Sequence, residues 1–202
     1  RCARLSGRQN FRRPQRRLSA AGPAAPERPP VYPAGRPAIL FVGRLQERKR
    51  VDLLLRAADS LPDDCRPQVI VVGDGPTRPQ LENLARQMDL PVTFTGARHG
   101  AALEPLYRQA DLFVLPGTGG LAVQQAMSYA LPVIVAEGDG TQDDLVRPEN
   151  GWQVPPGNLE SLAAALAAAL QQPARLRQMG RESYRIVAEE VNLENMVATF
   201  ER

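Results

Sequence analysis

The sequence predicts an α/β fold built on a doubly wound parallel sheet. Apolar runs recur along the chain, amphipathic stretches with helical spacing separate them, and several runs end in a glycine turn. Continuous apolar strands are typical of parallel sheets that are covered by helices on both faces. Ligands bind beyond the carboxyl ends of such strands, so we expect one crevice lined by the turns that follow Val42, Val72, Leu115 and Ala136.

The elements alternate from residue 38 onward. The apolar runs predict strands over residues 38–42, 69–72, 92–95, 112–115 and 132–136, and the helical spacing predicts helices from residue 51 and over 79–89, 101–109 and 121–130. Further on we expect a loop into a short helix, a brief edge strand within 149–157, a helix over 159–170 with a leucine stripe facing the core, and a helix with Pro173 in its first turn. Residues 193–200 also show helical spacing.

The N-terminal segment differs from the rest of the chain. Seven arginines and no acid fall among residues 1–17, and a Pro/Ala-rich stretch follows. Such a composition cannot form a packed core, so residues 1–36 are predicted to be a disordered basic arm or linker, and 37–202 the folded domain. A basic arm can bind nucleic acid or anionic lipid, but we expect no nucleic-acid partner here.

The chain is expected to be a piece of a longer protein, because it begins with Arg1. It contains no apolar run long enough to span a membrane. Its two cysteines, Cys2 and Cys65, predict free thiols in a reducing cytoplasm rather than a disulfide or metal framework. A location at the membrane surface is left open.

The strand-turn-helix-strand unit over residues 111–137 is the leading candidate for a ligand site. Its glycine turn, 116–120, opens a helix. Glycines let a ligand approach the backbone, and the free N–H groups and positive dipole end at a helix start favour an anion such as phosphate.

Two of the cations in the loop after the first strand, Arg44 and Lys49, are candidate ligand contacts. Lys49 is the only lysine in the chain, beside 24 arginines. A lysine retained in so arginine-rich a composition suggests a compact charge for a phosphate oxygen. Arg48 and Arg50, in the same loop, are expected to be solvated.

Other candidates have simpler explanations. Residues 117–122 fit G-x-G-x-x-A, and Glu137 ends the next strand, which makes an NAD(P)-binding oxidoreductase an alternative, but this turn follows the fourth strand rather than the first. His99, the only histidine, is expected at the surface. The acid pairs 63–64 and 143–144 suit helix caps better than a metal site, and Trp152 suits packing.

Five segments together resemble a known family. They are I-L-F-V-G-R-L-x-x-x-K at 39–49, V-I-V-V-G-D-G-P at 69–76, L-Y-R-Q-A-D-L-F-V-L-P at 106–116, G-L-A-V-Q-Q-A-M-S-Y-A-L-P-V-I at 120–134 and N-G-W-Q-V-P-P-G at 150–157. In order and spacing they resemble the C-terminal, donor-binding domain of GT-B glycosyltransferases of the group 1 type, which are retaining enzymes that use nucleotide-sugars. The resemblance implies a Rossmann-like domain that is one half of a GT-B fold.

The resemblance also implies roles for residues. The donor diphosphate would be bound by Arg44, Lys49, Gly119, Gly120 and Leu121. No metal or other cofactor would be needed, since cations and the helix dipole would neutralise the departing nucleoside diphosphate. No catalytic residue is assigned.

Three positions depart from the family pattern. Family members usually carry two glutamates eight positions apart, one at the donor sugar and one at the ribose; here Gly117 and Gln125 stand there, with Thr118 beside the first. Gln125 can still bond ribose hydroxyls, whereas Gly117 has no side chain to contribute. Arg50 replaces the usual glycine after the lysine.

The resemblance implies a partner domain as well. A GT-B enzyme has an N-terminal acceptor-binding domain, and residues 1–35 are too short to be one. We therefore expect a parent protein that transfers a sugar with retention of configuration, while this chain alone is inactive. A non-catalytic binding subunit is the alternative. The nucleotide base, the sugar, the acceptor (a glycan or a lipid-linked molecule among the options), the oligomeric state and contact with a membrane surface are left open.

Overall fold

The computed structural model describes residues 25–28, 32, 35–138 and 145–191. Its centre is one sheet of six parallel strands in the order β3-β2-β1-β4-β5-β6. The strands are β1 Ala38–Val42, β2 Gln68–Val72, β3 Val92–Gly96, β4 Leu112–Leu115, β5 Val133–Ala136 and β6 Gly151–Val154. The order reverses between β1 and β4, which is the switch point where ligands bind in such sheets.

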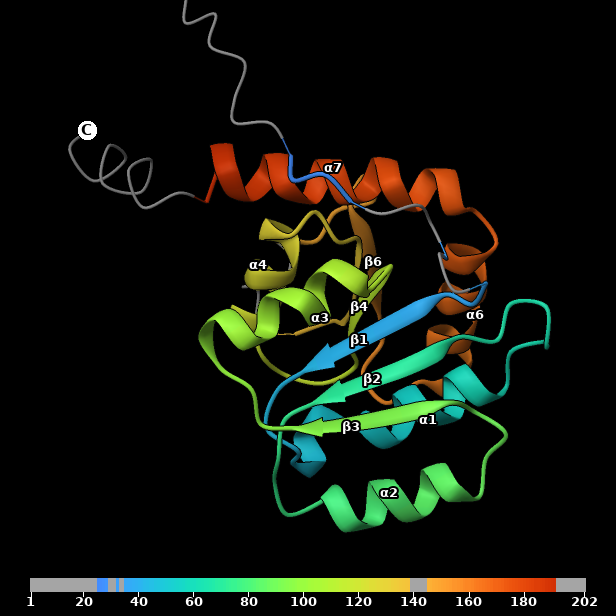
Figure 1. The fold of residues 1–202 in the computed structure, drawn as a ribbon. Helices are drawn as coiled ribbons and strands as arrows, with labels where there is room; N and C mark the ends of the chain where they lie inside the picture. Colours follow the sequence, from blue (N-terminus) through green and yellow to red (C-terminus); the bar gives the residue numbers. More distant parts are fainter. Residues whose placement is uncertain (1–24, 29–31, 33–34, 139–144, 192–202) are drawn as a thin grey trace, which may run out of the picture.

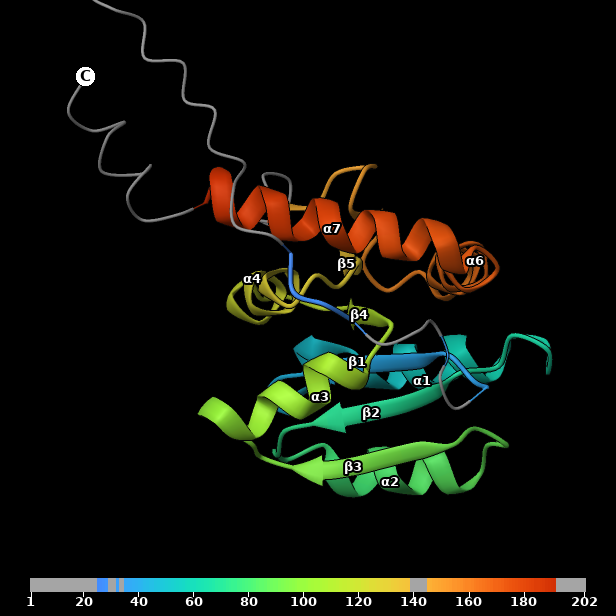
Figure 2. The same ribbon diagram turned by 45° about the horizontal axis from the view of Figure 1, so that its top comes forward.

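Helices lie on both faces of this sheet. They are α1 Val51–Asp59, α2 Arg78–Arg86, α3 Glu104–Gln109, α4 Leu121–Ser128, α6 Leu159–Leu170 and α7 Pro173–Glu189, with the short 3₁₀ turns η1 Glu47–Lys49 and η2 Gly100–Leu103. In Figure 1, α3 lies in front of β1 while α1 lies behind the sheet, and Figure 2 shows the same two layers from another angle. The predicted doubly wound α/β fold is confirmed.

The four central strands are almost wholly apolar and buried. Every residue of β4 and β5 is buried, and so are four of the five in each of β1 and β2. Burial on both faces explains why these strands read as continuous apolar runs rather than alternating ones. β6 is an edge strand of the sheet, as predicted.

Helix α7 packs closely against the turn that follows α4. A side chain at Gly180 would collide with the carbonyl oxygen of Ala130, and Ala130 itself has a positive φ of 54°. That left-handed residue ends α4, because it turns the chain into β5. Figure 1 shows α7 running alongside α4 above the sheet.

Several boundaries differ from the sequence prediction. α2 ends at Arg86 rather than 89, and α4 at Ser128 rather than 130. The predicted helix over 101–109 is divided into η2 and α3. In the leucine stripe of α6 the first member, Leu159, is 38% exposed while the others are buried. The predicted helical segment 193–200 and the loop 139–144 lie outside the described residues.

Two residues of the predicted arm are attached to the domain. Arg28 donates hydrogen bonds to the carbonyl oxygens of Tyr129 (2.6 Å) and Tyr107 (3.3 Å), at the ends of α4 and α3. The hydroxyl of Tyr32 donates to the carbonyl oxygen of Leu170 at 2.9 Å. Arg28 and Tyr32 are therefore held against the body, whereas residues 1–24 lie outside the described part and the arm prediction there stays a prediction.

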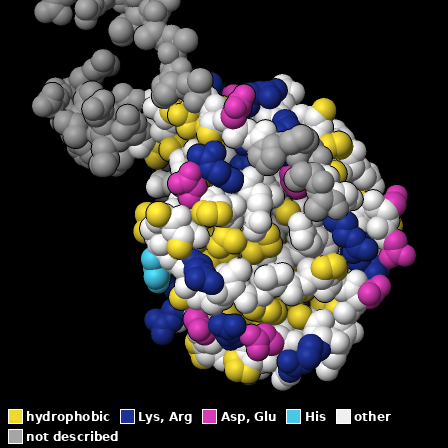
Figure 3. Space-filling model, in the orientation of Figure 1, with side chains coloured by type: hydrophobic (Ala, Val, Ile, Leu, Met, Phe, Trp, Pro, Cys, Tyr) yellow, Lys and Arg dark blue, Asp and Glu magenta, His cyan; other side chains and the backbone are white. Residues whose placement is uncertain are grey.

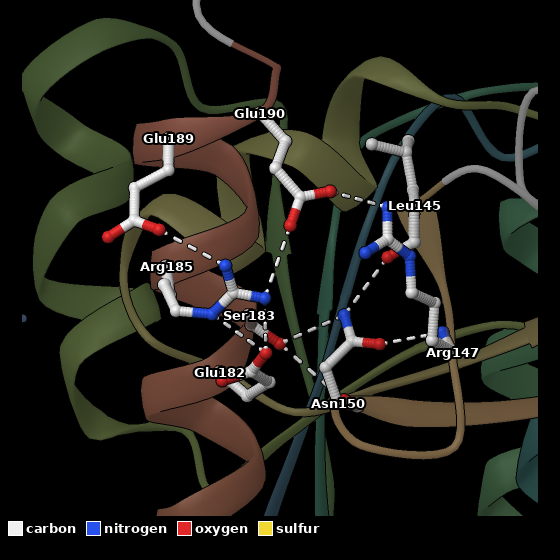
Figure 4. A network of polar contacts seen from close by, with 8 residues as sticks. All are labelled: Leu145, Arg147, Asn150, Glu182, Ser183, Arg185, Glu189 and Glu190. Carbon is white, nitrogen blue, oxygen red and sulfur yellow. Dashed lines mark hydrogen bonds and ion pairs between the residues drawn. The ribbon is translucent and has the colours of Figure 1, made fainter. Parts of the chain in front are cut away.

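Residues 145–150 are bonded to α7 through Asn150. The side chain of Asn150, fully buried, accepts from the N–H of Arg147 at 2.7 Å and donates to the carbonyl oxygen of Leu145 at 3.0 Å. It also bonds the hydroxyl of Ser183, on α7. Figure 4 shows this cluster beside an ion-pair network on the surface of α7 that includes Glu190.

Within the described residues, no helix is long and apolar enough to cross a membrane.

Candidate functional site

A cavity of about 630 Å³ opens at the carboxyl ends of the first three strands. Its lining includes the strand ends at residues 42–44, 72–75 and 97–99, and it reaches the first turn and a half of α4 at Leu121, Ala122 and Gln125. Helix α4 follows β4, so the cavity spans the switch point between β1 and β4. The turns after Val42 and Val72 line one crevice as predicted; no described residue after Ala136 lines it.

Three of the predicted donor contacts meet in this cavity. Arg44 is exposed and lies in its wall beside Gly43, while Leu121 and Gln125 come from one face of α4. Residues four apart on a helix lie one above the other, so these two present neighbouring groups to the same space. His99 also lines the cavity and is exposed, in agreement with the prediction that it lies at the surface.

Lys49 lies over the glycine turn rather than in the cavity wall. Its ammonium donates a hydrogen bond to the carbonyl oxygen of Thr118, and a side chain at Gly119 would collide with its Nζ. Gly119 has a φ of 144°. The missing side chain at Gly119 therefore leaves the space in which the ammonium reaches the loop before α4.

Arg48 joins the same loop, which the sequence analysis did not predict. Its Nη1 donates to the hydroxyl oxygen of Thr118 at 3.1 Å and its Nε to Oε1 of Gln46 at 3.1 Å. The N–H of Thr118 in turn donates to the carbonyl oxygen of Arg48 at 3.2 Å. Arg48 was expected to be solvated; its charge is exposed, and its side chain also hydrogen-bonds Thr118 and Gln46.

Gly117 is buried under the η1 turn. A Cβ there would collide with the carbonyl oxygen of Arg48 and would lie 2.7 Å from the carbonyl carbon and Cα of Lys49. Contacts of that length between non-bonded heavy atoms do not occur without displacement of the backbone. The backbone of Arg48 and Lys49 thus fills the place of any side chain at 117, including the glutamate that the family resemblance leads one to expect.

Arg50 supplies the left-handed residue that follows Lys49. It has φ 50° and ψ 41°, and its guanidinium pairs with Asp52 at 3.2 Å. A glycine adopts this conformation without strain, whereas other residues do so at a cost of about 1–2 kcal/mol. The backbone here keeps the shape of a glycine position although the residue is an arginine, and the side chain, expected to be solvated, is partly exposed and pairs with Asp52.

The start of α4 presents backbone N–H donors. Its N-cap, Gly120, has no side chain to cap the helix. The N–H of Val123 donates a hydrogen bond to the carbonyl oxygen of Gly120 at 3.0 Å. The N–H groups of the first turn lack partners within a helix and carry its positive dipole end. Leu121, directly after the N-cap, is 84% exposed, so the helix start is open to a ligand.

Gln125 is positioned by a buried tyrosine. The hydroxyl of Tyr107, on α3, donates to Oε1 of Gln125 at 3.3 Å, and its ring stacks on Tyr129 with the ring centroids 4.9 Å apart. Burial raises the pKa of Tyr107, so its hydroxyl stays a donor at neutral pH. With its oxygen engaged, the Gln125 amide has its N–H₂ group for a ligand in the cavity.

Burial lowers the pKa of Lys49 below that of an ordinary lysine, and the neighbouring charge of Arg48 lowers it further. Within the described residues, Arg44, Arg48 and Lys49 have no carboxylate partner. In the same part of the chain, no group of His, Cys, Asp and Glu side chains could hold a metal ion. Asp143 and Asp144 lie outside the described residues. The loop before α4 is therefore flanked by cations from the loop after β1 and is suited to an anion.

Figure 3 shows the surface of the face drawn in Figure 1. On its described part, Lys and Arg side chains lie around the rim next to Asp and Glu, with hydrophobic side chains toward the middle. A second hollow, of about 680 Å³, lies between α1 and α2. None of the predicted site residues lines it, so the cavity at the switch point is the better candidate site.

Comparison with known proteins identifies the family. A family profile described as glycosyl transferases group 1 matches residues 27–186, most of the chain. The sulfoquinovosyl transferase SQD2 of Arabidopsis thaliana is 34% identical over 141 residues, which are 67% of this chain and 27% of the relative. A GDP-mannose-dependent alpha-mannosyltransferase of Mycolicibacterium smegmatis is 42% identical over 122 residues, 57% of this chain and 29% of the relative.

Solved structures show the same fold. Sucrose-phosphate synthase from Thermosynechococcus elongatus superposes with a TM-score of 0.70 at 30% identity, over 84% of this chain and 45% of that one. Anabaena Alr3699/HepE in complex with UDP-glucose gives a TM-score of 0.72 at 21% identity, over 83% of this chain and 49% of that one. The chain thus spans less than half the length of each of these relatives.

Proposed function

Because the chain belongs to the glycosyl transferases group 1 family, we propose that it is the donor-binding part of a glycosyltransferase that moves a sugar from a nucleoside diphosphate to an acceptor. One observation carries the proposal: Arg44, Gln125 and the start of α4 share one cavity at the switch point, with Lys49 on the loop beside it. Cations and the N–H groups of a helix start suit a diphosphate.

The donor would lie along α4. The ribose would be bonded by the Gln125 amide, and the two phosphates by the N–H groups of Gly119 to Leu121 together with Arg44 and Lys49. When the sugar leaves, negative charge builds up on the diphosphate, and the fixed cations and the helix dipole would stabilise it. This arrangement would serve without a metal or other cofactor. Retention of configuration is proposed for the parent on the family resemblance alone.

The acceptor would be bound elsewhere. An acceptor-binding domain in the parent protein would face the cavity across a cleft, and the bulk of the relatives' length lies outside the part that this chain matches. We propose that the chain alone binds donor and turns over little or none of it. A glycan or lipid-linked acceptor and a peripheral membrane contact fit this scheme, and the cytoplasmic location stays a prediction.

A non-catalytic binding subunit is the second candidate. It is favoured by the burial of Gly117, since no side chain at that position could reach the donor sugar. The oxidoreductase alternative is not supported, because the family match is to glycosyl transferases.

Thermal-shift and titration measurements with UDP, GDP, ADP, NAD and NADP test the proposal. We expect a nucleoside diphosphate to stabilise the chain and the nicotinamide dinucleotides to have no effect. Stabilisation by NAD or NADP alone would refute it. A parent protein that binds donor without transferring or hydrolysing the sugar would establish the non-catalytic candidate instead.

A further inference from the structure

The guanidinium of Arg48 is hydrogen-bonded at the glycine turn. The guanidinium is bonded through Nη1 to Thr118 and through Nε to Gln46. The backbone carbonyl oxygen of Arg48 accepts from the Thr118 N–H. Two of the five N–H donors of the guanidinium are engaged by these contacts, which leaves the rest for a ligand. An exposed arginine normally samples many rotamers, and hydrogen bonds that restrict these rotamers lower the entropy that binding would cost.

The groups of the site follow one another along α4 and its preceding loop. Gln125 lies one helical turn, about 6 Å, beyond Leu121. Lys49 bonds the carbonyl oxygen of Thr118 beside Gly119, and Arg48 bonds the Thr118 hydroxyl, so both cations lie at the loop that precedes α4. If the nucleoside lies at Gln125 and the diphosphate at the helix start, as the proposed function on which this inference rests requires, the sugar extends toward Arg48.

The charges do not balance with a neutral sugar. The diphosphate of a nucleotide-sugar carries two negative charges, which Arg44 and Lys49 match, and Arg48 at the glycine turn and Arg98 in the cavity wall add two more cations. The nearby acids Asp52 and Asp74 are paired with Arg50 and Arg78. The exposed Glu47 and Glu137 form no ion pair with Arg48 or Lys49 in the described part of the chain.

The neighbouring cations also repel each other. The charge of Arg48 is one cause of the lowered pKa of Lys49, after burial. At the sugar end of the turn, residues 117–120 offer only one polar side chain, the hydroxyl of Thr118. The packing at Gly117 leaves no space for a second polar side chain at that position. An anionic group placed here would relieve the repulsion and would meet no carboxylate on the turn.

We propose that the donor sugar carries a carboxylate, as in a uronic acid, and that Arg48 is the residue that selects it. The planar guanidinium fork matches a carboxylate with two parallel hydrogen bonds, which a lysine or a hydroxyl cannot provide. Thr118 orients the guanidinium and is expected to bond a neighbouring sugar hydroxyl.

Calorimetric titration of the 202-residue chain tests this. Free UDP, GDP and ADP are titrated first, and glucose and glucuronate are then compared on whichever diphosphate binds most tightly. We expect the glucuronate donor to bind about tenfold more tightly than the glucose donor, the size of one charged hydrogen bond. Arg48→Gln is expected to bring the two affinities within about twofold of each other and to leave free diphosphate binding nearly unchanged.

The matched control is Arg56→Gln, which removes the same charge from an exposed position on α1 outside the site; it should keep the preference for glucuronate. Equal affinity for both donors in the wild-type chain would overturn the inference while leaving the proposed function intact. So would an Arg48→Gln variant that weakens free diphosphate and both donors alike, since Arg48 would then bind phosphate. If no free diphosphate binds, the proposed function fails and this inference fails with it.

Discussion

The ammonium of Lys49 donates a hydrogen bond to the carbonyl oxygen of Thr118, 69 residues later in the chain. This contact joins the turn after β1 to the turn before α4, and so brings the side-chain cations to the backbone donors of the helix start. The proposed diphosphate site depends on this junction, and the first predictions concern it.

Lys49→Ala should weaken nucleoside diphosphate binding by about 1–3 kcal/mol at neutral pH, because a charged hydrogen bond is lost. Calorimetric titration measures this, with Arg56→Ala as the control for net charge. Unchanged affinity in Lys49→Ala would mean that the lysine does not contact the diphosphate.

The same lysine predicts a pH dependence. The pKa of Lys49 is lowered by burial and by Arg48, so in the free chain the ammonium loses its proton at a lower pH than an ordinary lysine. Affinity for the diphosphate should therefore fall as the pH rises, beginning at a lower pH than an ordinary lysine would give. Lys49→Arg, whose guanidinium keeps its charge, should show no such fall. A parallel decline in both proteins would point to another group.

Gly117→Ala should displace the η1 turn, because the added Cβ would collide with the carbonyl oxygen of Arg48. We expect the free energy of unfolding to drop by about 1–3 kcal/mol, as in other overpacked sites, and diphosphate affinity to fall with it. The control is Gly35→Ala, where no atom lies within 4 Å of the added Cβ and only the positive φ of 79° opposes the change. Wild-type affinity in a folded Gly117→Ala chain would show that the turn's position is unimportant.

Arg50→Gly should stabilise the fold by about 1 kcal/mol, because glycine removes the strain of a left-handed arginine. The lost pair with Asp52 is largely solvated and contributes little. Arg50→Ala removes the same pair and keeps the strain, so the difference between the two variants in urea unfolding isolates the backbone effect. Equal stability of the glycine and alanine variants would contradict the strain.

Arg28→Met should destabilise the fold by about 2–4 kcal/mol, because carbonyl oxygens at the ends of α3 and α4 lose a charged donor. Burial lowers the pKa of Arg28 to about 10, so the guanidinium is charged at neutral pH. Arg36→Met, at an exposed arginine in the same segment, is the control. A wild-type melting temperature for Arg28→Met would mean that the N-terminal segment does not contribute to the domain.

Asn150→Ala should destabilise the fold by about 2–3 kcal/mol, since the N–H of Arg147 and the carbonyl oxygen of Leu145 would be left without their partner (Figure 4). Glu190→Gln breaks ion pairs on the surface of the same region and should change stability by less than about 1 kcal/mol. Chemical unfolding of both variants checks the contrast. A larger loss in the glutamate variant would reverse this ranking.

The sequence by itself determined the architecture of this protein. The apolar runs at β1, β2, β4 and β5 are continuous because both faces of those strands are buried, and burial of that kind leaves a pattern that can be read without a structure. The glycines before α4 and the cations after β1 could also be identified as a candidate site from the sequence. The glycines reflect a local requirement for close approach, and the cations a local requirement for charge. The motifs also pointed to the family, which the profile match confirms.

The tertiary structure alone decided how these parts meet. That Arg48 bonds Thr118, that the backbone of the same turn fills the space above Gly117, and that Tyr107 orients Gln125 are contacts between segments brought together by folding. They depend on backbone angles such as the left-handed φ of Arg50. An arginine at this position gives no sign of that conformation in the sequence. Local spacing encodes which face of an element is buried, but the distance between two loops is fixed only when the sheet between them has formed.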